Sequence, residues 1–179
     1  MLQSFKTGLA AALIVIGAAL PSVAQDSDWP DRETSRPRTT DGVPHVQIGI
    51  EPVPKFSEEL LRRVAEIPDV EIANTIVSLP GALGFWIDED VDLAHPEAIV
   101  RGREFAHIHP DGSLHASLNP ETAKIVSEKG WSIAHPWANQ RPGWEGFVMI
   151  YTPTTQAELD VVFDLVLASY RYVTGRTDG

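Results

Sequence analysis

Three of the six histidines lie between positions 107 and 115, in the run REFAHIHPDGSLHASL, residues 103–118. Its middle, Pro110-Asp111-Gly112, suits a three-residue loop, because proline favours the first turn position and glycine can adopt the left-handed conformation of the third. The run therefore predicts a β-hairpin in which the loop fixes the register of the two strands.

This register predicts that the three histidines share one face of the hairpin. His107 lies opposite His115, and successive side chains of a strand point to opposite faces. The predicted apolar face carries Ala106, Ile108, Leu114, Ala116 and Leu118, and the other face carries His107, His109, His115, Ser113, Ser117 and Phe105. A two-residue Asp-Gly loop would instead divide the histidines between the faces.

The first 24 residues predict a secretory signal peptide. Lys6 precedes a 13-residue apolar run, and Ser22-Val23-Ala24 fits the small-residue cleavage pattern. The run is short for a membrane span. We therefore expect cleavage after Ala24 and export to the periplasm or the medium, with no stable membrane insertion. An uncleaved anchor is the alternative.

The remaining chain predicts one domain. Residues 25–44 are rich in proline and polar residues without an apolar period, which predicts a flexible lead-in. Residues 45–175 then form the domain. Its first stretch, residues 45–54, predicts an edge strand or an extended arm, in which we interpret His45 as incidental.

Periodicity and end signals predict an α+β fold. Ser57 looks like a helix start, Asn119 caps a second helix, and Thr155 with Glu158 forms a capping box for the third. The expected helices span residues 57–67, 120–129 and 155–174. Further strands are expected near residues 85–87 and 146–153, and residues 70–76 form either a strand or a helix. This order predicts a small antiparallel or mixed sheet with helices packed on one face. Residues 131–146 have no regular period and predict a long loop, either a packed cover or part of a pocket.

Charge and cysteine content exclude several classes of function. Loss of the signal peptide would leave 13 basic and 25 acidic residues, a net charge of −12. Such a surface repels nucleic acid, so we expect no nucleic-acid partner. The chain has no cysteine, which excludes thiolate catalysis and thiolate metal sites.

The histidine face can support metal binding. Directly opposite Cβ atoms in a sheet lie about 4.5–5.5 Å apart, so His107, His109 and His115 can reach one transition-metal ion. Ligand imidazoles normally donate their second N–H to an acceptor. Strand alternation places Glu104 on the opposite face, which leaves only acceptors that are distant in sequence, such as Asp88 and Glu145.

Without a metal, the same histidines can act as general bases that deprotonate an enol or phenol and hold the anion. Arg103 or Arg141 would help to neutralise it, and His135 is a fourth candidate. Two alternatives are open. The histidines can simply bond Ser113, Ser117 or backbone carbonyls, or Ser113 can be a hydrolytic nucleophile, although no G-x-S-x-G elbow supports that role.

Several of these segments together resemble the fungal-luciferase-like domain family over roughly residues 56–173. They are REFAHIHPDGSLHASLNP, then Gly130-Trp131 followed by His135, and then GFVMIYTP before the last helix. The most specific part is the H-x-H-x-x-G-S-x-H pattern from His107 to His115. In the fungal luciferases the family activity is oxygenation of a hydroxylated pyrone by O₂, with light emission. This chain departs from the family pattern at 132–134 and at Thr154, so the resemblance does not imply a shared substrate, and it does not extend to light emission.

Two hypotheses follow from these observations. The first is an oxygenase of an enolisable or phenolic small molecule, without an organic cofactor and with metal dependence left open. The second is a non-catalytic periplasmic protein that binds a small molecule or a metal. The candidate catalytic residues are His107, His109, His115, His135 and Arg103, and the candidate substrate-binding residues are Ser113, Trp131, Trp137 and Arg141.

Overall fold

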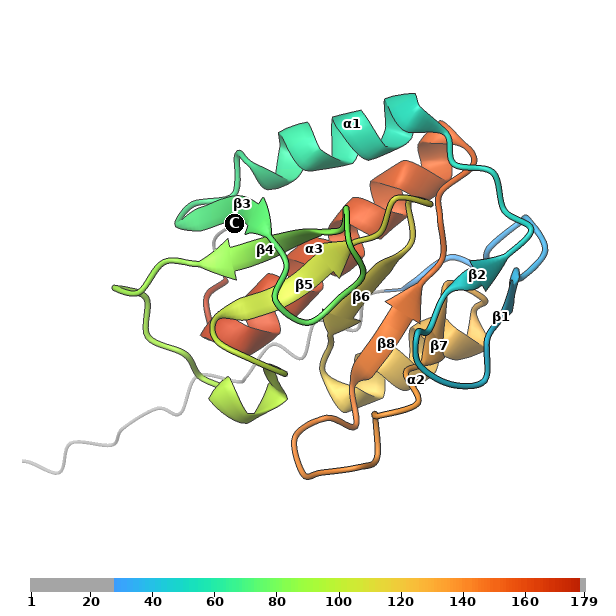
Figure 1. Ribbon diagram of the computed structural model, residues 1–179. Coiled ribbons are helices and arrows are strands. Elements are labelled where there is room, and N and C mark those ends of the chain that lie inside the picture. Colours follow the sequence, from blue (N-terminus) through green and yellow to red (C-terminus); the bar gives the residue numbers. More distant parts are fainter. Residues whose placement is uncertain (1–27, 178–179) are drawn as a thin grey trace, which may run out of the picture.

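The computed structural model describes residues 28–177 and is built on one six-stranded sheet (Figure 1). The strand order is β3-β4-β5-β6-β8-β7, and every neighbouring pair is antiparallel. The strands are β3 (Val70–Asn74), β4 (Leu83–Ile87), β5 (Glu104–Ile108), β6 (Leu114–Ser117), β7 (Ser132–Ala134) and β8 (Phe147–Ile150). A separate two-stranded sheet pairs β1 (Arg38–Thr39) with β2 (Gln47–Ile48).

Helices cover one face of the large sheet (Figure 1). α3 (Gln156–Thr174) contacts β5 and β6, α1 (Pro54–Val64) contacts α3 and β3, and α2 (Pro120–Glu128) contacts β7 and β8. A short 3₁₀ helix, η1, spans Pro96–Ala98. The predicted α+β class, with helices on one face, is confirmed, and the sheet is antiparallel rather than mixed.

Local signals place the helix ends. Asn119 accepts a hydrogen bond from the Glu121 N–H at 2.9 Å, and the Thr155 hydroxyl accepts one from the Glu158 N–H at 3.1 Å. α1 begins at Pro54 rather than at Ser57, because a proline in the first turn has its φ already set for a helix and lacks only an N–H that would be unpaired there.

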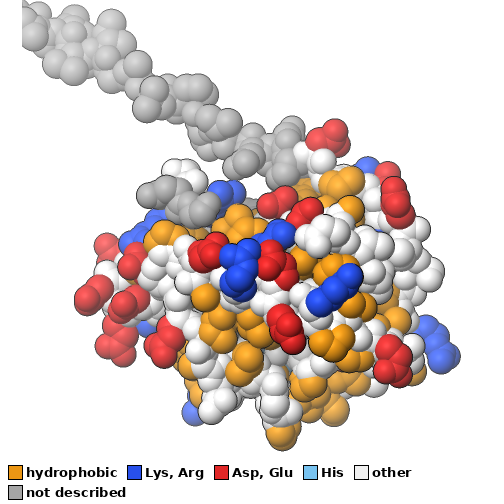
Figure 2. All heavy atoms as spheres, turned by 90° about the horizontal axis from the view of Figure 1, so that it is seen from above, with side chains coloured by type: hydrophobic (Ala, Val, Ile, Leu, Met, Phe, Trp, Pro, Cys, Tyr) orange, Lys and Arg blue, Asp and Glu red, His pale blue; other side chains and the backbone are white. Residues whose placement is uncertain are grey.

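The outer side of α1 carries charges of both signs. Arg62 pairs with Glu59 and Glu66, and Arg63 pairs with Glu59 and Asp160. Figure 2 shows the molecule from above, on the side where α1 lies, with acidic and basic side chains next to one another. In the part of the chain that the structure describes, no helix has the length and apolarity needed to span a membrane. The predicted signal peptide, residues 1–24, lies outside the described residues.

The hairpin register is as predicted. His107 pairs with His115 and Ile108 with Leu114, and Gly112 closes the loop at φ 84°. The apolar face, including Leu114 and Ala116, lies in the core under the helices. The three histidines therefore lie together on the face of the sheet that has no helix.

A β-bulge overturns the predicted placement of Glu104 and Phe105. β5 pairs with β4 through Ala106↔Phe85 and Glu104↔Trp86, so that Phe105 is the extra residue. The bulge reverses the alternation on its N-terminal side. Phe105 therefore packs in the core, with its ring 5.9 Å from that of Tyr170, and Glu104 lies on the histidine face.

The described part of the predicted lead-in packs against the domain. Trp29 is buried, and Arg32 forms a buried ion pair with Glu158 of α3 at 3.1 Å. The hairpin β1–β2 follows as an arm (Figure 1). The expectation of a flexible lead-in therefore does not hold for residues 28–44, because tertiary contacts fix a segment that has no apolar period of its own.

Candidate functional site

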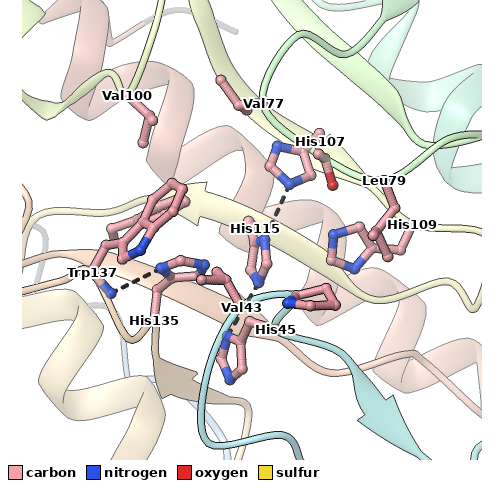
Figure 3. Close-up of a pocket in the computed structure, with 13 residues that line it drawn as sticks. Val43, His45, Val77, Leu79, Val100, His107, His109, His115, His135 and Trp137 are labelled. Carbon is pink, nitrogen blue, oxygen red and sulfur yellow. Dashed lines mark hydrogen bonds between the residues drawn. The ribbon is translucent and has the colours of Figure 1, made fainter.

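The helix-free face of the sheet contains a cavity of about 220 Å³, which we call the histidine pocket (Figure 3). Five of the six histidines line it, and each is no more than 5 % exposed. They are His45, His107, His109, His115 and His135, and the other lining residues are Val43, Pro44, Val77, Ser78, Leu79, Val100, Trp137 and Phe147. Apart from one serine, the wall between the imidazoles is apolar.

Four different segments bring the imidazoles together. β5 carries His107, with His109 just beyond its end, and β6 carries His115. His135 directly follows β7 and continues its pairing, since its N–H donates to the Phe147 carbonyl at 2.9 Å. His45 comes from the arm just before β2. The His115 ring is central, with centroid distances of 5.1 Å to His107, 4.6 Å to His109 and to His135, and 5.4 Å to His45.

A hydrogen-bonded chain starts at the buried carboxylate of Glu104. This carboxylate accepts from the Thr75 hydroxyl at 2.7 Å and from the Ile76 N–H at 3.0 Å, and it contacts Nδ1 of His107 at 2.8 Å. His107 Nε2 then lies 3.1 Å from His115 Nδ1. Because a carboxylate can only accept, His107 carries its proton on Nδ1, and in the neutral imidazole Nε2 is a lone-pair nitrogen.

The same rule gives the direction of the rest of the chain. With neutral rings, His115 donates from Nδ1 to His107, which leaves a lone pair on His115 Nε2. His45 Nδ1 lies 3.3 Å from that nitrogen and therefore acts as the donor. Nε2 of His45 is then a lone-pair nitrogen. One buried carboxylate thus orients three imidazoles.

His109 is oriented by a second carboxylate acting through a hydroxyl. Ser113 Oγ donates to Asp111 at 2.7 Å, so that its oxygen accepts from His109 Nδ1 at 2.9 Å. The lone pair of neutral His109 is therefore on Nε2. The role of Ser113 is therefore to orient a histidine, and its side chain is fully buried.

His135 has the opposite arrangement. The Trp137 N–H donates to its Nδ1 at 3.0 Å, so the neutral ring carries its proton on Nε2. The Trp137 ring also packs edge-on against the imidazole, with centroids 5.1 Å apart. Nε2 of His135 is therefore a hydrogen-bond donor, whereas Nε2 of His45, His107 and His109 carries a lone pair.

Burial keeps four of the imidazoles neutral at physiological pH. Loss of solvation lowers the pKa of His45, lowers that of His115 well below its ordinary value, and lowers those of His109 and His135 to about 4 and about 3. Mutual repulsion among the rings lowers the pKa values of His109, His115 and His135 further. Neutral imidazoles are what both metal binding and proton acceptance require.

Three predicted site residues lie away from the pocket. Arg103 donates from Nε to the Ile87 carbonyl at 3.0 Å, and its second contact is with the Val91 carbonyl. Trp131 is buried and donates to the Pro30 carbonyl at 2.6 Å. Arg141 stacks on Trp144, with its guanidinium carbon 4.3 Å from the ring centroid.

Two residues of the site, Glu104 and His45, are not predicted from the sequence. Glu104 was placed on the wrong face because the bulge at Phe105 has no local sequence signal. His45 was interpreted as incidental, and only the folding of the arm over the sheet brings it to the pocket. In contrast, the predicted candidates His107, His109, His115, His135 and Trp137 all line the pocket.

Comparison with known proteins agrees with the family resemblance of the hairpin. A family model described as "Luciferase domain" matches residues 102–169, which include β5 to β8 and four of the five pocket histidines. No curated protein and no solved structure matches the chain. Over residues 102–169 the chain is therefore similar to a luciferase domain, which is consistent with a luciferase-domain-containing family.

Proposed function

We propose that this protein is an oxygenase that adds O₂ to a small enolisable or phenolic molecule bound in the histidine pocket. The observation that carries the proposal is the pairing of opposite hydrogen-bonding roles in one buried, mostly apolar cavity. The hydrogen bonds leave a lone pair on Nε2 of His45 and an N–H on Nε2 of His135, and both residues line the cavity. An enol or phenol needs a base for its proton and a donor for the resulting oxyanion.

The proposed reaction needs no organic cofactor. His45 takes the hydroxyl proton of the substrate, and His135 donates to the enolate oxygen. The enolate carbon gives an electron pair to O₂ and forms a carbon–oxygen bond. The peroxide so formed takes the proton back from His45, so that substrate and O₂ give one hydroperoxide and O₂ is the oxidant. His107, His109 and His115 line the cavity beside this reacting pair.

The cavity limits the size of the substrate. Its volume of about 220 Å³ lies below the range of roughly 300–1,000 Å³ typical of sites for drug-sized ligands. Val77, Leu79 and Val100 supply aliphatic walls, and Trp137 and Phe147 supply aromatic ones. Monocyclic, uncharged hydroxypyrones and phenols fit this description best.

The test is oxygen consumption by the purified protein with a panel of monocyclic hydroxypyrones and phenols. We expect one O₂ per substrate, and a fall in kcat/KM of about 10²–10⁴-fold in His45→Gln and His135→Gln, the usual range for loss of a general acid or base. His95→Gln is the matched control, because His95 lies outside the pocket and contacts Glu97.

Binding of a panel member without oxygen uptake would refute the oxygenase and support the alternative, a non-catalytic binding protein. Export stays a separate proposal, based on residues 1–24. Edman sequencing of protein recovered from the periplasm or the medium would test it, with an N-terminus at Gln25 expected.

A further inference from the structure

We infer that His107, His109 and His115 bind one divalent transition-metal ion in the histidine pocket. Glu104 orients the His107 ring, and the Ser113–Asp111 pair orients the His109 ring. This inference deepens the proposed function and rests on it only for the use of the metal. Metal binding itself can be measured without any substrate.

The spacing of the nitrogens suits a shared ion. One ligand nitrogen from each of the three side chains lies within 4.8 Å of the other two, and His107 Nε2 and His115 Nδ1 are 3.1 Å apart. Two imidazole nitrogens on a tetrahedral ion, at metal–nitrogen distances of about 2.0–2.1 Å, are roughly 3.3–3.4 Å apart. Binding of the ion moves the His115 proton from Nδ1 to Nε2, where His45 Nδ1 lies 3.3 Å away and can accept it, and small ring rotations then complete the site.

The hydrogen bonds around the three rings match those of metal ligands. A metal-bound histidine usually donates its other N–H to a carboxylate or another acceptor, which fixes the ring and aims the lone pair at the ion. His107 donates from Nδ1 to Glu104, and His109 donates from Nδ1 to Ser113, which is held by Asp111. In both neutral rings Nε2 is therefore the nitrogen with the lone pair.

A second histidine group in the same pocket fits a metal less well. His45, His115 and His135 also bring ligand atoms within 4.8 Å of one another. However, the Trp137 N–H holds Nδ1 of His135, so Nε2 carries the proton. This proton cannot move to Nδ1, because the Trp137 N–H donates there, so Nε2 of His135 has no lone pair to give to an ion. The two groups share His115, and the hydrogen bonds favour the one that contains His107 and His109.

Charge also favours a dication. Glu104 is only 4 % exposed, and the groups that contact its carboxylate are Thr75, the Ile76 N–H and His107. The residues that line the pocket include no lysine or arginine. A buried carboxylate needs compensation by positive charge. A divalent ion bound to Nε2 of His107 would supply this positive charge, because Nδ1 of the same ring is hydrogen-bonded to the carboxylate.

The ligand set selects the class of metal. Three imidazoles suit zinc, copper, iron, cobalt or nickel, whereas magnesium and calcium require oxygen ligands. Three protein ligands leave at least one open position, and the side of the cluster free for it is the cavity proposed to hold the substrate.

The experiment measures metal binding directly, on protein purified without a histidine tag. Metal content of the protein as isolated is determined by mass spectrometry. The protein is then stripped with a chelator and titrated with Co²⁺, whose visible absorption reports nitrogen coordination, and with Zn²⁺ in competition. We expect one ion per chain.

The variants identify the ligands. His107→Gln and His109→Gln should abolish binding, and Glu104→Gln should weaken it about 10–100-fold, the effect usual for loss of an orienting carboxylate. His135→Gln and His95→Gln should bind as the wild type does. Circular dichroism of each stripped variant shows whether it is folded, and Glu104→Gln, which keeps the size of the side chain, tests the same site where a histidine variant is unfolded.

Each outcome decides the inference. Failure of the folded wild type to bind Co²⁺ or Zn²⁺, or binding that His135→Gln abolishes and His107→Gln retains, would overturn it. Oxygen uptake by stripped protein would leave the proposed function in place without the metal. One bound ion with no oxygen uptake would support the metal site and refute the oxygenase.

Discussion

Acid should destabilise this protein through the histidine pocket, in a pH range above that in which most carboxylates titrate. Burial lowers the pKa of His109 to about 4 and that of His135 to about 3, from an ordinary value of 6.5. Between these values and 6.5 the unfolded chain binds more protons than the folded one. Stability is therefore fully present above pH 6.5 and is lost as pH falls towards the folded pKa values.

The size of the effect follows from the same values. At pH 5, which is about 1.5 units below the ordinary histidine pKa, proton binding stabilises the unfolded state by about 2 kcal/mol per histidine. The folded state gains almost none of this, because its pKa values are lower. His109 and His135 together should lower the free energy of unfolding by about 4 kcal/mol between pH 7.5 and pH 5. His45 and His115 act in the same direction.

Urea unfolding at both pH values, with a chelator present, measures this difference. His135→Gln should reduce the pH-dependent loss by about 2 kcal/mol, because glutamine does not titrate. His95→Gln, at a half-buried position outside the pocket, should show the wild-type loss. The reasoning fails if His135→Gln and the wild type lose the same stability between pH 7.5 and pH 5.

Three further changes test other parts of the structure. Gly84→Ala would place a Cβ 2.9 Å from Cδ of Glu104, so we expect a loss of about 1–3 kcal/mol in thermal unfolding, and an unchanged Tm would contradict this contact. Arg32→Met leaves the carboxylate of Glu158 buried without its cation and should cost about 3–5 kcal/mol in urea unfolding; a cost below about 1 kcal/mol would mean that the lead-in is not anchored. Phe105→Ala should cost about 3–5 kcal/mol if the ring is in the core, whereas a ring on the pocket face would cost much less.

Features encoded by neighbouring residues were predicted correctly. The hairpin register follows from the three loop residues Pro110-Asp111-Gly112, and the helix starts at Asn119 and Thr155 follow from their capping side chains. These signals act within a few residues, where turn and cap chemistry dominates the conformation. They were sufficient to put three imidazoles on one face.

Features that depend on distant contacts were not predicted. The bulge at Phe105 places that ring in the core beside Tyr170. It is a feature of the pairing between β5 and β4, which lie apart in the sequence. β7 is a three-residue edge strand within a predicted loop, and its pairing with β8 is what carries His135 to the pocket. Arg103 was predicted from its charge and its closeness in sequence, but backbone carbonyls bind its guanidinium elsewhere.

The arm that carries His45 lies outside residues 102–169 and is anchored to the domain by hydrogen bonds between Gln47 and Thr152, and the lead-in before it is anchored by the Arg32–Glu158 pair. It contributes Val43, Pro44 and His45 to the wall of the pocket. The hairpin histidines and the wall that covers them are thus separate pieces of chain. Changes at Val43 and Pro44, or a longer arm that keeps His45, can reshape the cavity for a different molecule while the histidines of β5 and β6 stay in place, which makes this segment the natural place to engineer a new substrate range.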